Sequence, residues 1–75
     1  MIKEAAILSE GIIYTGRRHN EIYKKYPMKT FNEVQGFVTE EGIFLNRIKA
    51  EDHARACGQL TKPLIGSILT SEDLW

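Results

Sequence analysis

The 75-residue sequence has few of the residues on which enzyme and metal sites depend. Its single cysteine excludes an intramolecular disulfide, and its two histidines fall in separate predicted helices. These residues are too few for the four ligands of a structural zinc site. Neither the phosphate-binding loop of P-loop NTPases nor the G-x-G-x-x-G dinucleotide fingerprint is present. We therefore expect no enzyme activity, no cofactor and no metal.

The cysteine is the one candidate nucleophile. Cys57 follows His53 by four residues, so a thiol and a base lie one helical turn apart. Both residues also fall on a predicted helical stripe with Ala50 and Ala54, where a cysteine is usually a small core residue. We therefore interpret Cys57 as part of the core.

The sequence also has no excess of positive or negative charge, because ten Lys and Arg residues balance ten Asp and Glu residues. No net field draws the chain to nucleic acid or to an anionic membrane. The charge is divided, with +3 over residues 1–30 and −3 over residues 31–75. The sequence has neither the pattern of a signal peptide nor an apolar run long enough to cross a membrane. We expect a soluble cytoplasmic protein.

The chain length predicts one domain over residues 1–75. A chain of this size buries only about 60% of the surface that its unfolded form exposes, so its core is thin. Small cores are often supplemented by a second subunit. We therefore expect a homo-oligomer.

Residues 5–26 predict a β-hairpin followed by a helix. A Glu-Gly pair at positions 10–11 separates two short apolar runs, and glycine supplies the positive φ that a tight hairpin turn needs. The following residues predict a helix over 17–26, which Pro27 is expected to end. Four side chains at helical spacing make up its inward face: His19, Ile22, Tyr23 and Tyr26.

Residues 36–57 repeat this order. A turn at 40–42 separates two apolar runs, and Asn46 is a good N-cap for a helix over 47–57, which Gly58 ends. The expected inward stripe of this helix is Ala50, His53, Ala54 and Cys57. Its expected outer side carries Arg47, Glu51 and Arg55.

The two units align when the sequence is shifted by 31 positions, which places residues 7–15 over residues 38–46. Each unit has a Glu-Gly turn, three apolar residues and then a capping residue, Thr15 or Asn46. True duplication and the general likeness of hairpin–helix units both explain this match. The predicted fold class is α+β, with two ββα units forming a four-stranded antiparallel sheet and both helices on one face.

The C-terminal tail extends this prediction. Residues 64–69 are a candidate fifth strand, since they are mostly apolar. Thr70 followed by acidic residues predicts one helical turn that ends at Trp75. A tryptophan is costly to leave in water, so we expect Trp75 to pack on the body or on a second subunit.

Polar residues at the two predicted helix starts are the strongest candidates for a ligand site. Arg17, Arg18 and His19 open the first helix, and Asn46 and Arg47 open the second. Free N–H groups at a helix start favour an anion, and arginine forks clamp phosphate oxygens. The alternatives are solvated arginines, a packed His19 and a simple N-cap at Asn46. If the helices lie side by side, these polar groups converge on one rim.

Three further residues are weaker candidates. Gln35 precedes Gly36, where the missing side chain allows another backbone or a ligand to approach. Phe37 could stack on a base or a sugar, although an aromatic residue in such a strand is more typical of a core. Gln59 is a candidate ligand-binding residue only because it is a polar residue just after the end of a predicted helix. A nucleic-acid site on the basic first helix conflicts with the neutral charge of the domain.

An ordered series of residues runs through most of the chain. It consists of Arg18-His19, Gln35-Gly36-Phe37-Val38-Thr39, Gly42, Phe44, Arg47, Ala50, Ala54, Gly58-Gln59, Leu69 and Ser71-Glu72-Asp73-Leu74-Trp75. This series resembles a widespread family of short phage and prophage proteins, most of which have no assigned function. Members often carry a second histidine where Asn20 stands here, and a longer segment before the Gln-Gly-Phe strand.

The resemblance implies a phage protein that acts in the cytoplasm of a bacterial host. Some small phage proteins of comparable build are anti-defence oligomers that sequester nucleotide signals, either cyclic ADP-ribose isomers or cyclic oligonucleotides. We hypothesise such sequestration, without hydrolysis, for this chain. Alternatives are an interaction module that docks on a host protein through the tail and Trp75, and a small nucleic-acid-binding protein. The candidate ligand-binding residues are Arg17, Arg18, His19, Gln35, Phe37, Asn46, Arg47 and Gln59.

Overall fold

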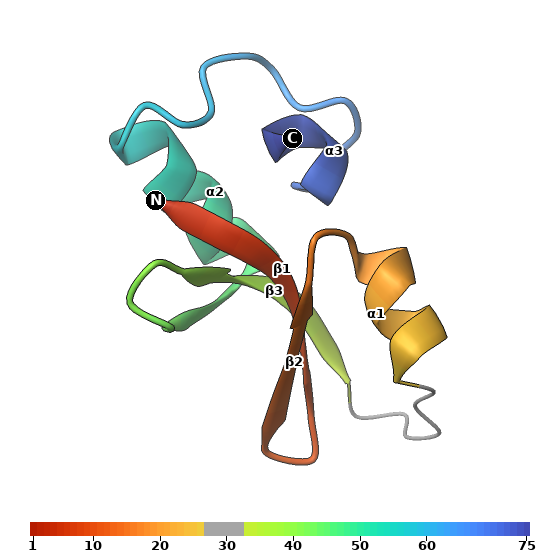
Figure 1. Cartoon of the computed structure of the whole chain (residues 1–75). Helices are drawn as coiled ribbons and strands as arrows, with labels where there is room; N and C mark the ends of the chain where they lie inside the picture. The colour runs from red at the N-terminus through yellow and green to blue at the C-terminus, as the bar shows by residue number, and fades with distance from the viewer. Residues whose placement is uncertain (27–32) are drawn as a thin grey trace.

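The computed structural model describes residues 1–26 and 33–75, which form a small α+β fold (Figure 1). The strands make one antiparallel sheet in the order β2-β1-β3-β4, so the predicted class and four-stranded sheet are confirmed. Pro27 and most of the connector that follows it lie outside the described residues. The elements are β1 (Ile2–Ser9), β2 (Ile12–Gly16), α1 (His19–Lys25), β3 (Val34–Thr39), β4 (Phe44–Asn46), α2 (Arg47–Ala56) and α3 (Ser71–Leu74).

The first strand of each unit lies in the middle of the sheet, and the second strand lies at an edge. In the central pair β1 and β3, Ala5 stands opposite Phe37 and Ile7 stands opposite Gln35. Opposite residues of antiparallel strands point to the same face, so these four side chains share one face. The two units therefore meet along the β1–β3 pair.

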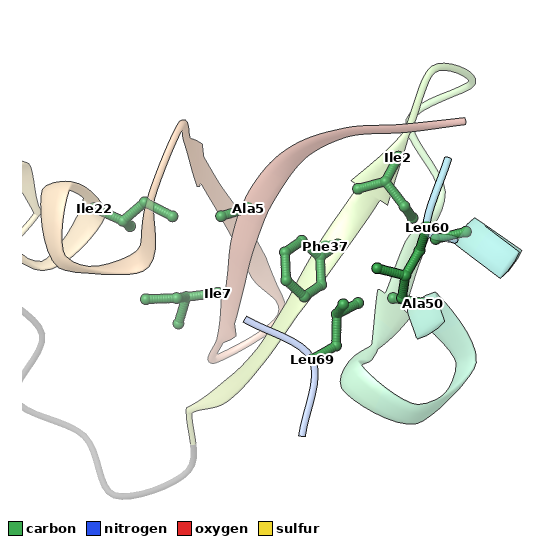
Figure 2. Close-up of a cluster of buried hydrophobic side chains, with 9 residues drawn as sticks. Ile2, Ala5, Ile7, Ile22, Phe37, Ala50, Leu60 and Leu69 are labelled. Carbon is green, nitrogen blue, oxygen red and sulfur yellow. The ribbon is translucent and has the colours of Figure 1, made fainter. Parts of the chain in front are cut away.

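That face of the sheet carries the core (Figure 2). The strand residues Ala5, Ile7 and Phe37 have no exposed surface. Ile22 of α1 and Ala50 of α2 pack into the same cluster, so both helices cover one face, as predicted. The complete cluster comprises Ile2, Ala5, Ile7, Ile22, Phe37, Ala50, Ala54, Leu60 and Leu69.

The two hairpins turn in different ways. Glu10 and Gly11, with φ angles of 51° and 77°, make a two-residue turn in which both residues have positive φ. The second hairpin has only Gly42 at positive φ, 83°, and its connection is longer. It is closed by the main-chain N–H of Ile43, which donates to Oγ1 of Thr39 at 3.2 Å.

Helix α1 begins later than the sequence predicts. Thr15 is still in β2, so the prediction that it caps the helix is wrong. Arg18 holds the N-cap position in an extended conformation, and its main-chain N–H donates to Oε2 of Glu21 at 3.1 Å. A side chain inside the first turn, rather than one before it, therefore caps α1.

Helix α2 follows β4 without an intervening residue. Oδ1 of Asn46 accepts a hydrogen bond from the N–H of Lys49 at 2.8 Å, which confirms Asn46 as the N-cap. On the inward stripe Ala50 and Ala54 are wholly buried. Cys57, in contrast, is exposed, so its interpretation as a core residue is wrong. It lies at the helix C-cap, where the chain turns away at Gly58 with φ of 80°.

The tail after α2 crosses the same face as the helices and contributes Leu60 and Leu69 to the core. It adds no strand to the described sheet, so the alternative of a fifth strand is wrong. The N–H of Ile65 donates to Oδ1 of Asp73 at 2.9 Å instead of joining a sheet ladder. The predicted helical turn is present as α3, where Oδ2 of Asp73 accepts from the N–H of Thr70.

None of the helices in residues 1–26 and 33–75 is long and apolar enough to cross a lipid bilayer.

Candidate anion-binding site

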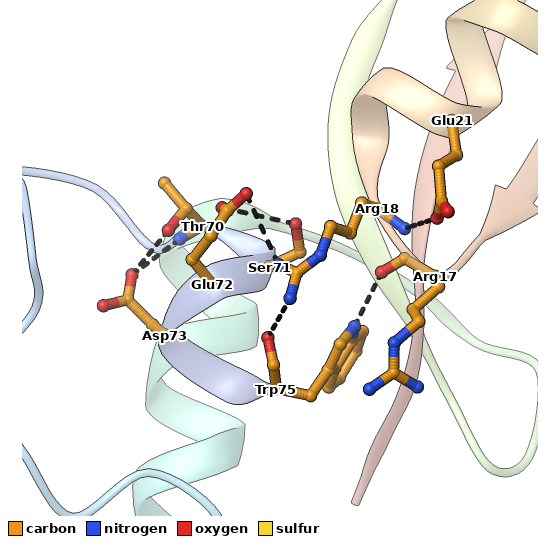
Figure 3. Close-up of polar contacts among 8 residues, drawn as sticks. All are labelled: Arg17, Arg18, Glu21, Thr70, Ser71, Glu72, Asp73 and Trp75. Atoms are coloured by element: carbon orange, nitrogen blue, oxygen red, sulfur yellow. Dashed lines mark hydrogen bonds and ion pairs between the residues drawn. The ribbon is translucent and has the colours of Figure 1, made fainter.

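Arg18 and Arg47, here called the arginine pair, hold the two ends of α3. Nη2 of Arg18 donates to the main-chain oxygen of Trp75 at 2.7 Å (Figure 3). Nη1 of Arg47 donates to the carbonyl of Leu69, which lies before α3. The two predicted helix starts thus converge on one segment, residues 69–75, and α3 lies between α1 and α2 (Figure 1).

Glu72 places a carboxylate beside the arginine pair. Its Oε1 lies 3.4 Å from Nη1 of Arg18, and its side chain is 58% exposed. Nη1 of Arg18 is enclosed and donates no hydrogen bond within the described residues. The pair is therefore electrostatic, and it leaves one of the strong donors of Arg18 without a bonded acceptor.

The charge of Glu72 reaches further than Arg18. The hydrogen bond from its own main-chain N–H, and then the Arg18 guanidinium, lower the pKa of Glu72. Burial lowers the pKa of Arg47, whereas the charges of Tyr23 and Glu72 oppose that effect. The charge of Glu72 therefore influences both arginines, whereas its ion pair within the described residues is with Arg18.

Arg47 also begins a hydrogen-bonded network across the covered face of the sheet. Its Nη2 donates to Oε1 of Gln35, and Nε2 of Gln35 donates to the Tyr23 hydroxyl at 2.9 Å. The hydroxyl of Tyr23 donates in turn to Oε1 of Glu33 at 2.9 Å. Burial and the Glu33 hydrogen bond raise the pKa of Tyr23. The network fixes Arg47 on the inner side of α2, although the sequence places it on the outer side.

His19 and Phe37 lie beneath α3. Nε2 of His19 donates to the carbonyl of Gly36 at 2.8 Å, and its ring meets Phe37 edge to face at 5.1 Å between centroids. Phe37 also meets Trp75 edge to face at 6.5 Å. Phe37 has no exposed surface, so a base or a sugar cannot stack on it in this conformation. The alternative prediction, a core phenylalanine, fits its position.

Trp75 packs on the body of the molecule, as one of the two expected arrangements requires. Besides contacting Phe37, its indole Nε1–H donates to the carbonyl of Arg17 at 2.7 Å (Figure 3). The side chain of Arg17 is exposed next to Arg18. The indole of Trp75 therefore makes contacts within this chain, and less of its surface is available to dock on another protein.

Two predicted residues stand apart from the arginine pair. Gln59 forms two hydrogen bonds with the main chain of Ile2, accepting from its N–H at 2.7 Å and donating to its carbonyl at 2.9 Å. Asn46 uses its side-chain oxygen to cap α2. Both residues serve the fold in these contacts, and neither contacts Arg18 or Arg47 through the hydrogen bonds of the described residues.

Sequence reasoning does not identify three participants, Tyr23, Glu33 and Glu72. Tyr23 has a signal, because it lies one turn after His19 on the predicted inward face, but that signal indicates a core residue. The sequence pattern around Glu72 indicates only a first-turn residue of α3. Within the described residues no three His, Cys, Asp or Glu side chains are grouped as a metal site would require.

Comparison with known families supports the phage origin that the sequence suggests. The family model described as phage T4 y16D protein matches residues 1–75, which is the whole chain. Comparisons with curated proteins and with solved structures gave no significant match. The chain therefore belongs to the phage T4 y16D protein family.

Proposed function

We propose that this phage protein is a non-enzymatic binder of a small phosphorylated ligand, which it takes up at the arginine pair in the bacterial cytoplasm. The ligand class that we favour is a nucleotide-derived immune signal of the host, of the cyclic ADP-ribose or cyclic oligonucleotide type. The protein sequesters this signal without hydrolysing it. The observation that carries the proposal is the half-exposed carboxylate of Glu72 beside Arg18.

The Glu72 carboxylate marks a point that is both open to solvent and close to guanidinium groups. Nη1 of Arg18 is enclosed beside this carboxylate and has no hydrogen-bond acceptor among the described residues, so an anion that replaces the Glu72 carboxylate supplies one. A phosphate group offers more acceptor oxygens than a carboxylate and binds arginine forks in the same bidentate manner. Arg17, which precedes Arg18 in the chain, is exposed and adds a positive charge to this region.

The proposal reassigns several of the residues named from the sequence. Arg18 and Arg17 contact the phosphate, while Gln35 and Tyr23 hold Arg47 in place through the hydrogen-bonded network. Phe37 has no direct role, because it has no exposed surface. Gln59 has none either, because its side-chain amide is bound to Ile2.

Isothermal titration calorimetry with cyclic ADP-ribose isomers and cyclic dinucleotides tests the proposal. We expect at least one ligand to bind, and the Arg18→Gln variant to bind it about tenfold more weakly, the size expected when one charge-assisted hydrogen bond is lost. Arg55→Gln is the matched control, because Arg55 pairs with Glu51 on the exposed side of α2.

Two results contradict the proposal. If none of these ligands binds, the sequestration function is wrong. If a ligand binds but chromatography of the mixture recovers a cleaved product, the protein is an enzyme. Native mass spectrometry of the same samples measures the number of subunits, for which we expect a dimer or larger.

A nucleic-acid-binding function is the second candidate, because α1 presents exposed basic side chains. Lys24 and Lys25 of α1 are exposed, as is Arg17 just before it. Binding that rests on phosphate contacts weakens steeply as the salt concentration rises. DNA or RNA binding with such a salt dependence, lost in a Lys24→Gln, Lys25→Gln double variant, supports this candidate against the first.

A further inference from the structure

We propose that Glu72 competes, within the molecule, with the ligand for Arg18 and so sets the affinity that an anion needs in order to bind. This inference rests on the proposed function, which it deepens by naming the ligand class: an anion with two or more negative charges on adjacent phosphates, such as a pyrophosphate group. The carboxylate of Glu72 occupies the position of the anion until such a ligand replaces it.

The geometry around Arg18 favours replacement over permanent pairing. Glu72 approaches Nη1 of Arg18 only to 3.4 Å, which is longer than a good charge-assisted hydrogen bond. Its side chain is 58% exposed, so it can rotate into water without leaving a charge buried. The Arg18 side chain, 31% exposed, keeps its hydrogen bond to the main-chain oxygen of Trp75 and remains oriented after Glu72 departs.

The fold holds the backbone of α3 independently of the Glu72 side chain. Leu69 is wholly buried, and the carbonyl of Leu69 accepts from Arg47. Asp73 caps α3 through Thr70 and also binds the N–H of Ile65. The exchange of one carboxylate for a phosphate therefore needs a side-chain rotation and no opening of the tail.

Competition with a carboxylate sets the affinity that an anion needs in order to bind. Displacing Glu72 from Arg18 costs every anion the same free energy. A ligand with a single negative charge only replaces one charge with another, so it gains little at Arg18. A pyrophosphate group brings more negative charge and more acceptor oxygens to Nη1 of Arg18, so it can offset that cost.

Titration of the full chain with inorganic pyrophosphate, inorganic phosphate and acetate tests this role. We expect Glu72→Gln to bind pyrophosphate roughly two- to fivefold more tightly, the range that loss of one exposed ion pair supplies. Acetate binding should tighten by a similar factor, because both anions displace the same carboxylate. Glu51→Gln is the matched control, because it removes a carboxylate that pairs with Arg55 instead of Arg18. It should leave the affinities for pyrophosphate and for acetate unchanged.

The outcomes separate this inference from the proposed function. If pyrophosphate binding depends on Arg18 but Glu72→Gln does not tighten it, the competitor role is wrong while the proposed function stands. If neither the wild type nor Glu72→Gln binds pyrophosphate, both are wrong. Emission from Trp75, the single tryptophan, reports in every sample whether the packing of α3 is intact.

Discussion

The two hairpin–helix units have the same order of elements, yet they join the strand to the helix differently. In the first unit Arg17 and Arg18 separate β2 from α1, and Glu21 caps the helix. In the second unit α2 follows β4 directly, and Asn46 caps it. Because of this offset, one arginine stands before its helix and the other inside it. The difference lets the pair hold opposite ends of α3.

We expect the largest difference in stability between the two units when a glycine of each is replaced by alanine. A Cβ at Gly36 would lie 2.2 Å from the carbonyl oxygen of Leu45, which is main chain and cannot move aside. We expect Gly36→Ala to lower the free energy of unfolding by about 3 kcal/mol, the upper range for overpacking. A Cβ at Gly16 would meet the Ile22 side chain at 2.9 Å, which can rotate. Gly16→Ala should cost only about 1 kcal/mol.

Urea unfolding of both variants measures this contrast. Equal losses in the two variants would contradict the distinction between a backbone and a side-chain obstacle. If Gly16→Ala lowers the free energy of unfolding more than Gly36→Ala does, the main chains of β3 and β4 are not as close at Gly36 as described.

The next difference between the units concerns the pH dependence of stability. Helix α1 begins with His19, which can titrate near neutral pH, whereas α2 begins with Arg47. Burial lowers the pKa of His19 below 6.5, and the charge of Arg47 acts in the same direction. The folded protein therefore keeps His19 neutral while the unfolded chain takes up a proton as the pH falls through 6.5. The stability that this group contributes is complete above that pH and is lost below it.

We expect the free energy of unfolding to decrease between about pH 7 and about pH 5, by no more than about 1.4 kcal/mol per pH unit. Chemical denaturation at a series of pH values measures it. His19→Gln, which keeps a donor for the Gly36 carbonyl, should reduce the slope. A slope that is unchanged in this variant would assign the pH dependence to other groups.

We expect the smallest difference in stability when the residues that cap α1 and α2 are replaced by alanine. Asn46→Ala removes the acceptor for the N–H of Lys49 and should cost about 1 kcal/mol. Glu21→Ala removes the acceptor for the N–H of Arg18, an exposed contact at 3.1 Å, and should cost less, about 0.5 kcal/mol. Thermal unfolding compares the two variants. If Glu21→Ala is the more damaging, α1 depends on its cap more than the geometry indicates.

The sequence predicts those features that depend on neighbouring residues. The Glu10-Gly11 turn, the turn at Gly42 and the Asn46 cap follow from the φ preference of glycine and from a side chain three residues before a free N–H. The sequence predicts a start of α1 that is too early, because Arg17 and Arg18 are compatible with a helix and the residue that caps α1, Glu21, lies inside it.

The contacts of the candidate site depend on residues far apart in the sequence, and periodicity does not specify them. The spacing of Arg47 with Glu51 predicts that it lies on the outer side of α2, but its hydrogen bonds to Leu69 and Gln35 turn it inward. The spacing of apolar residues says which face of an element is covered. It does not say which polar group crosses that face, and it therefore left Glu72 out of the site.

The side chain of Gln59 acts on β1 as a neighbouring peptide group would, by bonding both the N–H and the carbonyl of Ile2. Residues 2 and 59 are 57 positions apart, as are Arg18 and Trp75. The Ile2 end of β1 therefore gains these two bonds only once a residue 57 positions later is in place, whereas the pairing of β1 with β2 needs only the neighbouring hairpin. Contacts between residues so far apart form more slowly than local ones, so we expect this end of the strand to be fixed late in folding.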